Sequence, residues 1–175
     1  KTSHALLDGD LPIPTVGWDA GDLSLEVTAL ATGLPDSSAL LARYRVSNRS
    51  TSDRKVRLVL AIRPLQVNPP WQFLGTPGGV SEIRTLAFEA RRARVNRHRV
   101  VVPLVTASAS GATTFDAGDV TALLRSGSFP GSVKVEDATG LASGAFAFDL
   151  DLPAGGEREV VVTMPFDDTR VPPDL

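Results

Sequence analysis

The sequence predicts an all-β protein, a large antiparallel β-sandwich with one short helix. Three observations lead to this fold class. Eight or nine segments alternate apolar and polar residues with the period of a strand, turn-forming residues separate them at short intervals, and a single segment has helical spacing. With 175 residues, of which 42% are hydrophobic, the chain is long enough for one buried core. One domain over residues 1–175 is therefore expected.

An irregular N-terminal arm is predicted over residues 1–21, because this segment is polar and contains prolines. Its apolar anchors are Leu11, Ile13, Val16 and Trp18. The pair Gly21-Asp22 then precedes LSLEVTAL, whose leucines, valine and alanine fall on alternate positions. Residues 23–30 are therefore predicted to form the first half-buried strand of the sheet.

The next two strands are predicted as a hairpin. Residues 38–48 place Leu40, Ala42, Tyr44 and Val46 on one face, and residues 55–65 alternate in the same way. A short polar cluster, residues 48–53, separates the two runs and has the composition of a turn. Pro64 ends the second strand, because proline cannot donate a hydrogen bond to a neighbouring strand.

A long proline- and glycine-rich loop is predicted over residues 63–83. Loops of this length in compact domains are often functional or pack against another surface. The candidate residues for contact with a ligand or a neighbouring domain are Arg63, Gln66, Asn68, Trp71, Gln72 and Arg84. The apolar members, which predict a docking patch, are Val67, Trp71, Phe73 and Leu74. Packing of Trp71 against the core or another domain is favoured over stacking on a sugar, and both readings stay open.

The second half of the chain continues the strand pattern around one helix. Residues 82–90 and 94–104 are strand candidates of undetermined register. Asp119 is the predicted N-cap of a helix of at most two turns, which ends at Gly127. Residues 144–153 and 158–166, joined by a Pro-Ala-Gly-Gly turn, predict an antiparallel ending, and residues 167–175 predict an aspartate- and proline-rich linker.

Charge is distributed unevenly along the chain. Residues 43–99 hold 13 of the 18 lysines and arginines but only 3 of the 20 carboxylates. One interpretation is a patch for an anionic polymer centred on Arg91, Arg92, Arg94, Arg97 and Arg99. The favoured interpretation places these arginines beside carboxylates of the terminal strands, because opposite charges pair across a sheet and the aromatic residues that stack on bases are missing. No nucleic-acid partner is therefore expected.

Composition also argues against several kinds of site. No apolar run approaches the length of a membrane span, so no membrane partner is expected. Zero cysteines and only two histidines, His4 and His98, exclude thiolate ligands and disfavour zinc, and we expect no metal and no cofactor. The pair Asp149 and Asp151 alternates with apolar residues and is expected on a solvated strand face, whereas Asp167 lies in a segment without calcium-loop spacing.

Two parts of the sequence carry a family resemblance. The segments LSLEVTAL and LLARYRVSNRSTSDRKVRLVLAIRPL, followed by GAFAFDLDLPAGGEREVVVTMPF, resemble the supersandwich, or galactose-mutarotase-like, domain that precedes an α/α-barrel catalytic domain in many carbohydrate-active enzymes. The motif positions are Val46-Ser47-Asn48, Pro64 and Leu152 to Glu157. The resemblance implies a sandwich of the supersandwich type over about two thirds of the chain, but a fold does not by itself deliver a function.

The resemblance leads to three functional expectations. The first is a noncatalytic accessory domain of a larger bacterial carbohydrate-active protein, with another domain of the same chain as its partner. The second is an independent carbohydrate-binding module that uses the Trp71 loop, with carbohydrate as its partner. The third is a mutarotase-like epimerase, which needs an acid and a base at the anomeric centre; only His98 is plausible as the acid, and no carboxylate can be assigned opposite it.

Overall fold

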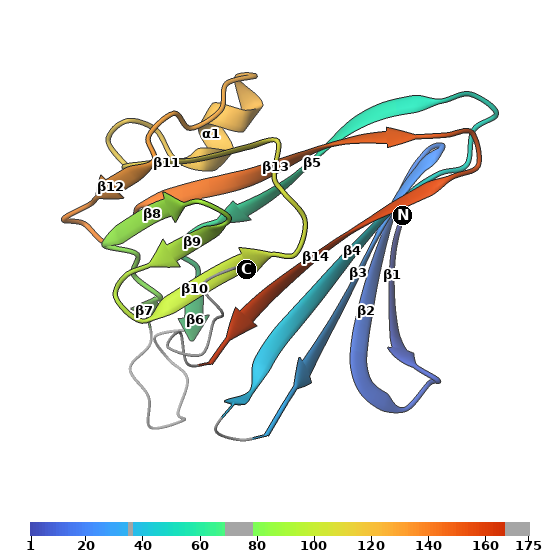
Figure 1. The fold of residues 1–175 in the computed structure, drawn as a ribbon, viewed down its shortest axis with the longest axis horizontal. Coiled ribbons are helices and arrows are strands. Elements are labelled where there is room, and N and C mark those ends of the chain that lie inside the picture. Colours follow the sequence, from blue (N-terminus) through green and yellow to red (C-terminus); the bar gives the residue numbers. More distant parts are fainter. Residues whose placement is uncertain (35–36, 69–78, 167–175) are drawn as a thin grey trace. The chain divides into compact units, whose positions relative to one another are not determined.

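The computed structural model describes residues 1–34, 37–68 and 79–166. Within these ranges the fold is all-β with one short helix, as the sequence predicts (Figure 1). The elements are β1 (Thr2–Leu7), β2 (Leu11–Ala20), β3 (Leu23–Thr32), β4 (Ala39–Asn48), β5 (Arg54–Ile62), β6 (Gln66–Asn68), β7 (Gly79–Val80), β8 (Thr85–Glu89), β9 (Arg92–Val95), β10 (Arg99–Pro103), β11 (Ala109–Thr113), α1 (Val120–Arg125), β12 (Lys134–Glu136), β13 (Ser143–Leu152) and β14 (Glu157–Pro165).

The strands form three sheets. The largest has nine strands in the order β1-β2-β3-β4-β14-β10-β9-β8-β12, the second has the order β11-β13-β5, and β6 pairs with β7 in a small ribbon. Neighbouring strands whose register is resolved pair in antiparallel fashion, for example β3 with β4 over their full ten residues. Two large antiparallel sheets and one short helix agree with the predicted sandwich class.

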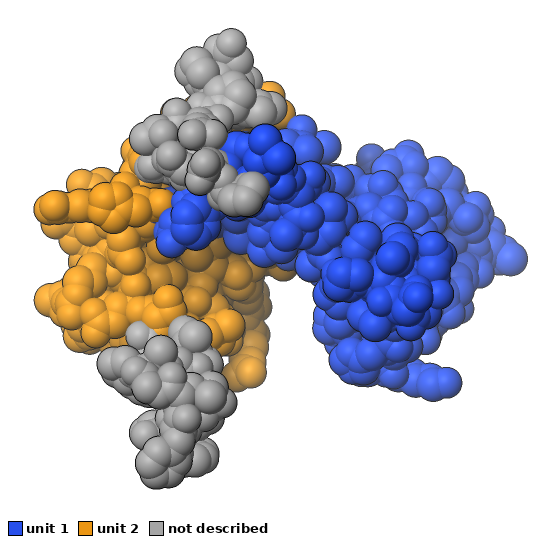
Figure 2. Space-filling model, turned by 90° about the horizontal axis from the view of Figure 1, so that it is seen from below, with its two compact units in different colours: residues 1–58, 99–107, 148–175 blue, residues 59–98, 108–147 orange. Residues whose placement is uncertain are grey.

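The chain divides into two compact units (Figure 2). Unit 1 comprises residues 1–58, 99–107 and 148–175, and unit 2 comprises residues 59–98 and 108–147. Unit 1 contains the long strands β1 to β4 and β14, which pair side by side. Its fully buried side chains include Val100, Val102, Leu152 and Val160.

Unit 2 has its own core, built from small and aromatic side chains. Leu86, Ala93, Ala112 and Val120 are completely or almost completely buried. The rings of Phe88 on β8 and Phe146 on β13 meet edge to face, with centroids 4.9 Å apart. A Cβ atom on Gly144 would lie only 2.6 Å from the carbonyl oxygen of Gly111, so a residue without a side chain is needed at this close approach.

The predicted helix is confirmed, together with the residue that begins it. The Asp119 carboxylate accepts hydrogen bonds from the backbone N–H groups of Thr121 and Ala122, which are unpaired donors of the first turn. Gly127, predicted as the stop, adopts a positive φ of 79° just after the helix. These local signals were reliable because each depends on the chemistry of one residue.

The predicted N-terminal arm is wrong: residues 2–20 form an antiparallel hairpin, β1 and β2. The prolines that suggested an irregular arm lie before Thr15, where β2 pairs with β1 but not yet with β3. Pro14, for example, stands opposite Leu6 of β1, and the pairing with β3 begins only at Thr15. A proline is tolerated there because one side of the strand has no neighbour that needs its N–H.

Both predicted hairpins in the rest of the chain are also wrong. β4 pairs with β3 and β14, and not with β5, which lies at the end of the three-stranded sheet. In the same way β13 belongs to the three-stranded sheet and β14 to the nine-stranded one. The two polar turns therefore connect different sheets. Alternation identifies which side chains share a face of a strand, but it carries no information about the neighbouring strand.

Asn48 joins these two connections. Its side-chain amide donates to the carbonyl oxygens of Ser52 and Pro153, at 2.8 and 3.0 Å, and it accepts from the Ser50 hydroxyl at 2.7 Å. The side chain is 1% exposed. Backbone bonds link the same turns, from Asn48 N–H to the Gly156 carbonyl and from Gly155 N–H to the Ser50 carbonyl. Two motifs that carry the family resemblance therefore meet in one buried network.

The predicted loop over residues 63–83 contains more regular structure than expected. Gln66 pairs with Val80 and Asn68 with Gly79 in the β6–β7 ribbon, and Ile83 is buried and bridges to Leu141. The part between residues 69 and 78 and the linker predicted over 167–175 lie outside the described residues.

Candidate functional site

The candidate site is an apolar groove in unit 1 with a volume of about 320 Å³. It is lined by Trp18, Ala20, Leu23, Ser24, Leu25, Val46, Val56, Arg57 and Leu58. These residues come from β2, β3 and β4 on one side and from β5 on the other. We call this feature the Trp18 groove.

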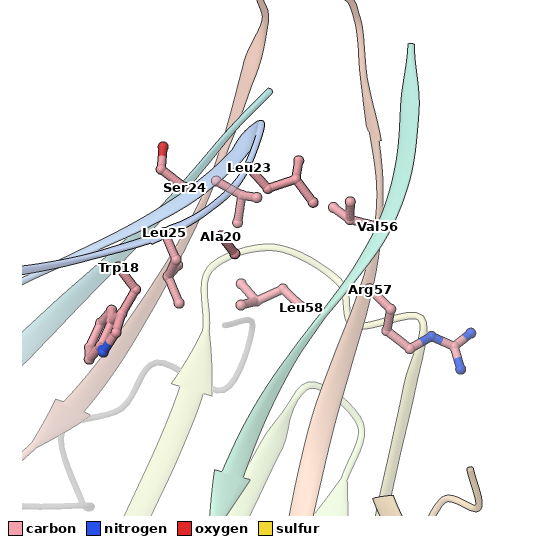
Figure 3. A pocket seen from close by; sticks show the side chains of 9 residues that line it. Trp18, Ala20, Leu23, Ser24, Leu25, Val56, Arg57 and Leu58 are labelled. Atoms are coloured by element: carbon pink, nitrogen blue, oxygen red, sulfur yellow. The ribbon is translucent and has the colours of Figure 1, made fainter. Parts of the chain in front are cut away.

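Strand register explains why these side chains meet. Trp18 of β2 stands opposite Leu25 of β3, and Leu25 stands opposite Val46 of β4, so the three side chains form one row across the sheet. Ala20 and Leu23 form the next row, beside the turn at Gly21. Figure 3 shows the side chains of Trp18, Leu25 and Leu58 turned toward a common hollow. We call this side of the long sheet its inner face.

Burial decreases along the row from β4 toward β2. Val46 is only 8% exposed, Leu25 is half-buried, and Trp18 is 42% exposed. The row on the other side, which runs from Val160 of β14 through Val27 to Val16, shows the same trend, because Val160 is fully buried whereas Val27 and Val16 are half-buried. The inner face therefore continues as an apolar surface beyond the strands that cover it.

Among the described residues that line the groove, none points a charged group into it. Arg57 is the one ionisable residue in its lining, and its guanidinium points away from the hollow (Figure 3). It forms two hydrogen bonds, of 2.6 and 3.0 Å, with the Asp149 carboxylate on the opposite face of the small sheet. This pair raises the pKa of Arg57 further above its usual value. An apolar group thus matches the groove better than a charged or hydroxylated one.

The other face of the long sheet, its outer face, carries the charges. Arg45 donates to Glu159 across β4 and β14 at 2.9 Å, and Arg43 lies 3.7 Å from Glu26 on β3. The hydrogen bond that Arg45 donates to Glu159 raises the pKa of Arg45. On β5 of the three-stranded sheet, Arg54 and Lys55 also approach carboxylates, at 3.6 and 3.7 Å. This arrangement confirms, for these residues, the interpretation that mid-chain arginines lie beside carboxylates from the ends of the chain.

Two of the arginines proposed as the centre of an anionic-polymer patch, Arg94 and Arg99, have local partners as well. Arg94 lies 3.8 Å from Glu89. Arg99 donates to the carbonyl oxygen of Phe166 at 2.9 Å, and its guanidinium lies 5.3 Å from the centre of the Phe166 ring. A cation over an aromatic face is favourable, so this arginine helps to hold the end of β14 in place.

The candidate site predicted in the loop is divided between described residues, Arg63 and Arg84, and residues outside the described part of the chain. Arg84 is exposed, pairs with Glu82 at 2.7 Å and donates to the Ala138 carbonyl at 2.6 Å. Arg63 is also exposed; the pKa of Asp119 is lowered mainly by hydrogen bonds from Thr121, and the charge of Arg63 adds a smaller effect in the same direction. The two arginines thus serve different elements of unit 2. The side chains of Gln66 and Asn68, and the whole of Trp71 and Gln72, lie outside the described part of the chain, as do Val67, Phe73 and Leu74 of the predicted docking patch.

Three of the described acids, Asp137, Asp149 and Asp151, are bound by hydrogen bonds or ion pairs. Asp137 is buried and accepts from the backbone N–H of Phe115 at 2.7 Å and of Thr139 at 2.9 Å, and these bonds hold its pKa below the ordinary value. Asp149 and Asp151 lie exposed beside Arg57 and Lys55, as expected for a solvated strand face. His98 is exposed. Over residues 1–34, 37–68 and 79–166, no three acids or histidines lie close enough together to hold a metal ion.

Sequence reasoning missed the Trp18 groove, although a signal for it was present. Val16, Trp18 and Ala20 alternate before the Gly21-Asp22 turn, and Leu23 and Leu25 alternate after it. This is the pattern of a tight hairpin with one apolar face. The prolines upstream outweighed that signal.

Comparison of the sequence with known protein families and with curated proteins finds no match. None of the helices in the described ranges has the length and apolarity needed to cross a bilayer.

Proposed function

We propose that this chain is a noncatalytic accessory domain of a larger carbohydrate-active protein, where it packs against a catalytic neighbour and positions it. The carbohydrate part of this proposal comes from the sequence motifs around Asn48 and Leu152, which resemble the supersandwich domain. The docking part comes from one observation, the partly exposed apolar inner face at the Trp18 groove.

The exposed area of Trp18 indicates how much a covering partner would contribute. A tryptophan buries up to about 250 Å² when fully enclosed, so 42% exposure leaves roughly 100 Å² of mostly apolar surface in water. At about 25 cal/mol per Å², covering this one side chain is worth about 2.5 kcal/mol. Leu23 and Leu25, which are also only half-buried, add to this driving force.

The chemistry of the described residues favours docking over catalysis. Asp119 and Asp137 accept backbone hydrogen bonds, and Asp149 and Glu159 are paired with arginines. A sugar site needs planar polar groups beside an aromatic ring, but the planar polar group in the lining of the Trp18 groove, the Arg57 guanidinium, is turned away and paired.

The test measures Trp18→Ala in two contexts, the 175-residue chain alone and the longer polypeptide in which it occurs. In the chain alone the substitution removes a half-exposed side chain and should cost little. In the longer polypeptide it should cost about 2.5 kcal/mol more, because covered apolar area is lost. Leu34→Ala is the matched control, since Leu34 is 74% exposed away from the groove.

Equal effects of Trp18→Ala in the two contexts would contradict the docking role. Two further assays address the alternatives. Mutarotation of glucose above the buffer rate, lost in His98→Ala, would indicate an epimerase. Binding of the isolated chain to a glycan array, lost in Trp71→Ala, would indicate an independent carbohydrate-binding module.

A further inference from the structure

We propose that the Trp18 groove accepts an extended segment of a neighbouring domain as an added β-strand, which pairs with the free edge of β5 and lies over β3 and β2. The inference rests on the proposed function in one respect, because it requires a neighbour to supply the strand. It goes further by naming the edge, the mode of binding and the chemistry of the segment.

The first step is the mismatch between the two layers of unit 1. Within the described ranges, β5 is the last strand of the three-stranded sheet, in the order β11-β13-β5. The long sheet opposite it continues past β4 through β3, β2 and β1. Val56 and Leu58 of β5 face Leu23 and Leu25 of β3 across the groove, so a strand placed beside β5 would cover the exposed part of the inner face.

The second step is the backbone. A strand at the end of a sheet leaves one row of N–H and C=O groups without a strand partner, and such an edge is a template for strand addition. The part of β5 in unit 1, residues 54–58, offers this edge directly beside the apolar groove. An added strand can then form backbone hydrogen bonds with β5 and place its inward side chains in the groove. This mode of binding satisfies both the unpaired edge and the exposed apolar surface.

The third step is the size of the surface. β2 and β3 are ten residues long. With a rise of about 3.4 Å per residue and a spacing of about 4.8 Å between strands, β2 and β3 cover roughly 34 by 10 Å, and the six-residue β1 adds roughly 20 by 5 Å. This footprint of about 440 Å² is smaller than the roughly 800 Å² per partner of a stable dimer. It suits one or two strands that are tethered to a neighbouring domain.

A second copy of this chain does not fit the same edge. Pairing β5 of two copies in antiparallel fashion would join their small sheets into one continuous layer. The overhanging strands β1 to β3 of both copies would then lie beneath that layer and occupy the same space. The added strand is therefore not β5 of a second copy, and a segment of a neighbouring domain is the occupant that fits.

Charge defines the outward side of the added strand. Lys55 and Arg57 project from β5 on the side away from the groove. There they form ion pairs with Asp151 and Asp149 of β13. The Lys55 side chain is 92% exposed, so its free flank is available to another carboxylate. Because opposite charges favour cross-strand pairing, the added strand should alternate apolar residues that point inward with aspartate or glutamate that points outward.

The experiment selects displayed heptapeptides, randomised at all seven positions, on the full 175-residue chain. Counter-selection uses Leu25→Asp, which places a carboxylate in the groove, and the control is Leu34→Asp at an exposed site. Enriched peptides should alternate apolar and acidic residues and should bind Leu25→Asp at least about tenfold more weakly than the control. Circular dichroism and the melting temperature of both variants verify that they fold, and Trp18→Ala serves as a second groove variant. Failure to enrich such peptides on the unmodified chain would overturn the proposal.

N-methylation of the selected peptide tests the mode of binding. Alternate residues of an added strand direct their N–H groups to β5 or to solvent. Methylating one set of alternate nitrogens should therefore weaken binding at least about tenfold, and methylating the other set should leave it unchanged. Equal effects of both sets would exclude strand addition.

The outcomes separate this inference from the proposed function. If Trp18→Ala costs more in the longer polypeptide but the selection yields no peptides that alternate apolar and acidic residues, the docking role stands and strand addition is rejected. Alternating peptides sensitive to one N-methylation set, with equal Trp18→Ala effects in both contexts, would retain the groove as a strand acceptor and reject the docking role.

Discussion

The buried network around Asn48 allows a quantitative prediction. Asn48→Ala removes a side-chain amide that donates to the carbonyls of Ser52, Pro153 and Leu152 at 2.8, 3.0 and 3.3 Å, and an oxygen that accepts from Ser50 N–H at 3.1 Å and from its hydroxyl at 2.7 Å. The alanine leaves several of these groups without a partner at a site that is 1% exposed.

The magnitude follows from the unpaired groups. Each buried polar group that loses its partner costs about 1–3 kcal/mol, and the Ser52 carbonyl keeps the Ser50 hydroxyl as a donor whereas the Leu152 and Pro153 carbonyls lose theirs, so the free energy of unfolding should fall by about 2–6 kcal/mol. For a chain of this size the melting temperature should fall by roughly 4 to 24 °C. Ser50→Ala, which removes only a hydroxyl from the network, should cost about 1 kcal/mol.

Urea unfolding followed by circular dichroism measures these changes as a shift in the midpoint at constant slope. Ser47→Ala is the control, because Ser47 is adjacent in sequence but lies on the opposite face of β4, and it should change stability by less than about 0.5 kcal/mol. A loss below about 1 kcal/mol in Asn48→Ala would refute the reasoning, since it would mean that water replaces the amide and that the two turns are not held together by it.

Two further predictions concern unit 2. The hydrogen bonds from Phe115 and Thr139 lower the folded-state pKa of Asp137 below 3.8, so in acid the unfolded state binds more protons than the folded state. The contribution of Asp137 to stability is therefore complete above about pH 4 and is lost as the pH falls toward the folded-state pKa. Asp137→Asn should therefore lower stability at pH 7 and flatten its decline below about pH 4 in acid-unfolding curves, whereas an unchanged decline would contradict this role. Gly144→Ala should cost about 1–3 kcal/mol in thermal melts, because the added Cβ would lie 2.6 Å from the Gly111 carbonyl, whereas Gly131→Ala, with open space around it, should be near neutral; equal melting temperatures would contradict the close approach.

The sequence predicted those parts of the fold that depend on local chemistry. Alternation placed Leu25 and Val46 on a buried face, and Asp119 marked the start of the helix, because both signals act within a few residues. The pairing of β4 with β14 joins residues about 115 positions apart, for example Arg45 with Glu159, and nothing in either segment specifies that partner. For the same reason two turns between sheets were mistaken for hairpins.

The candidate site was harder to predict because its residues matter only in combination. Trp18 is a lone aromatic in a proline-bearing segment until β2 is placed beside β3, and its exposure depends on where β5 ends the smaller sheet. The proline-rich loop attracted attention through its composition, which is a local signal. The Trp18 groove arises instead from a difference in the number of strands between two layers, which alternation does not encode.

The most direct measurement of the docking role is the accessibility of Trp18 in solution. In a Trp71→Phe background Trp18 is the one tryptophan left in the chain, so its fluorescence reports on the groove alone. The isolated chain should be readily quenched by acrylamide, and the longer polypeptide proposed to contain it should show a blue-shifted emission and several-fold weaker quenching. Equal emission and quenching in the two proteins would contradict the claim that this inner face is covered by a neighbouring domain.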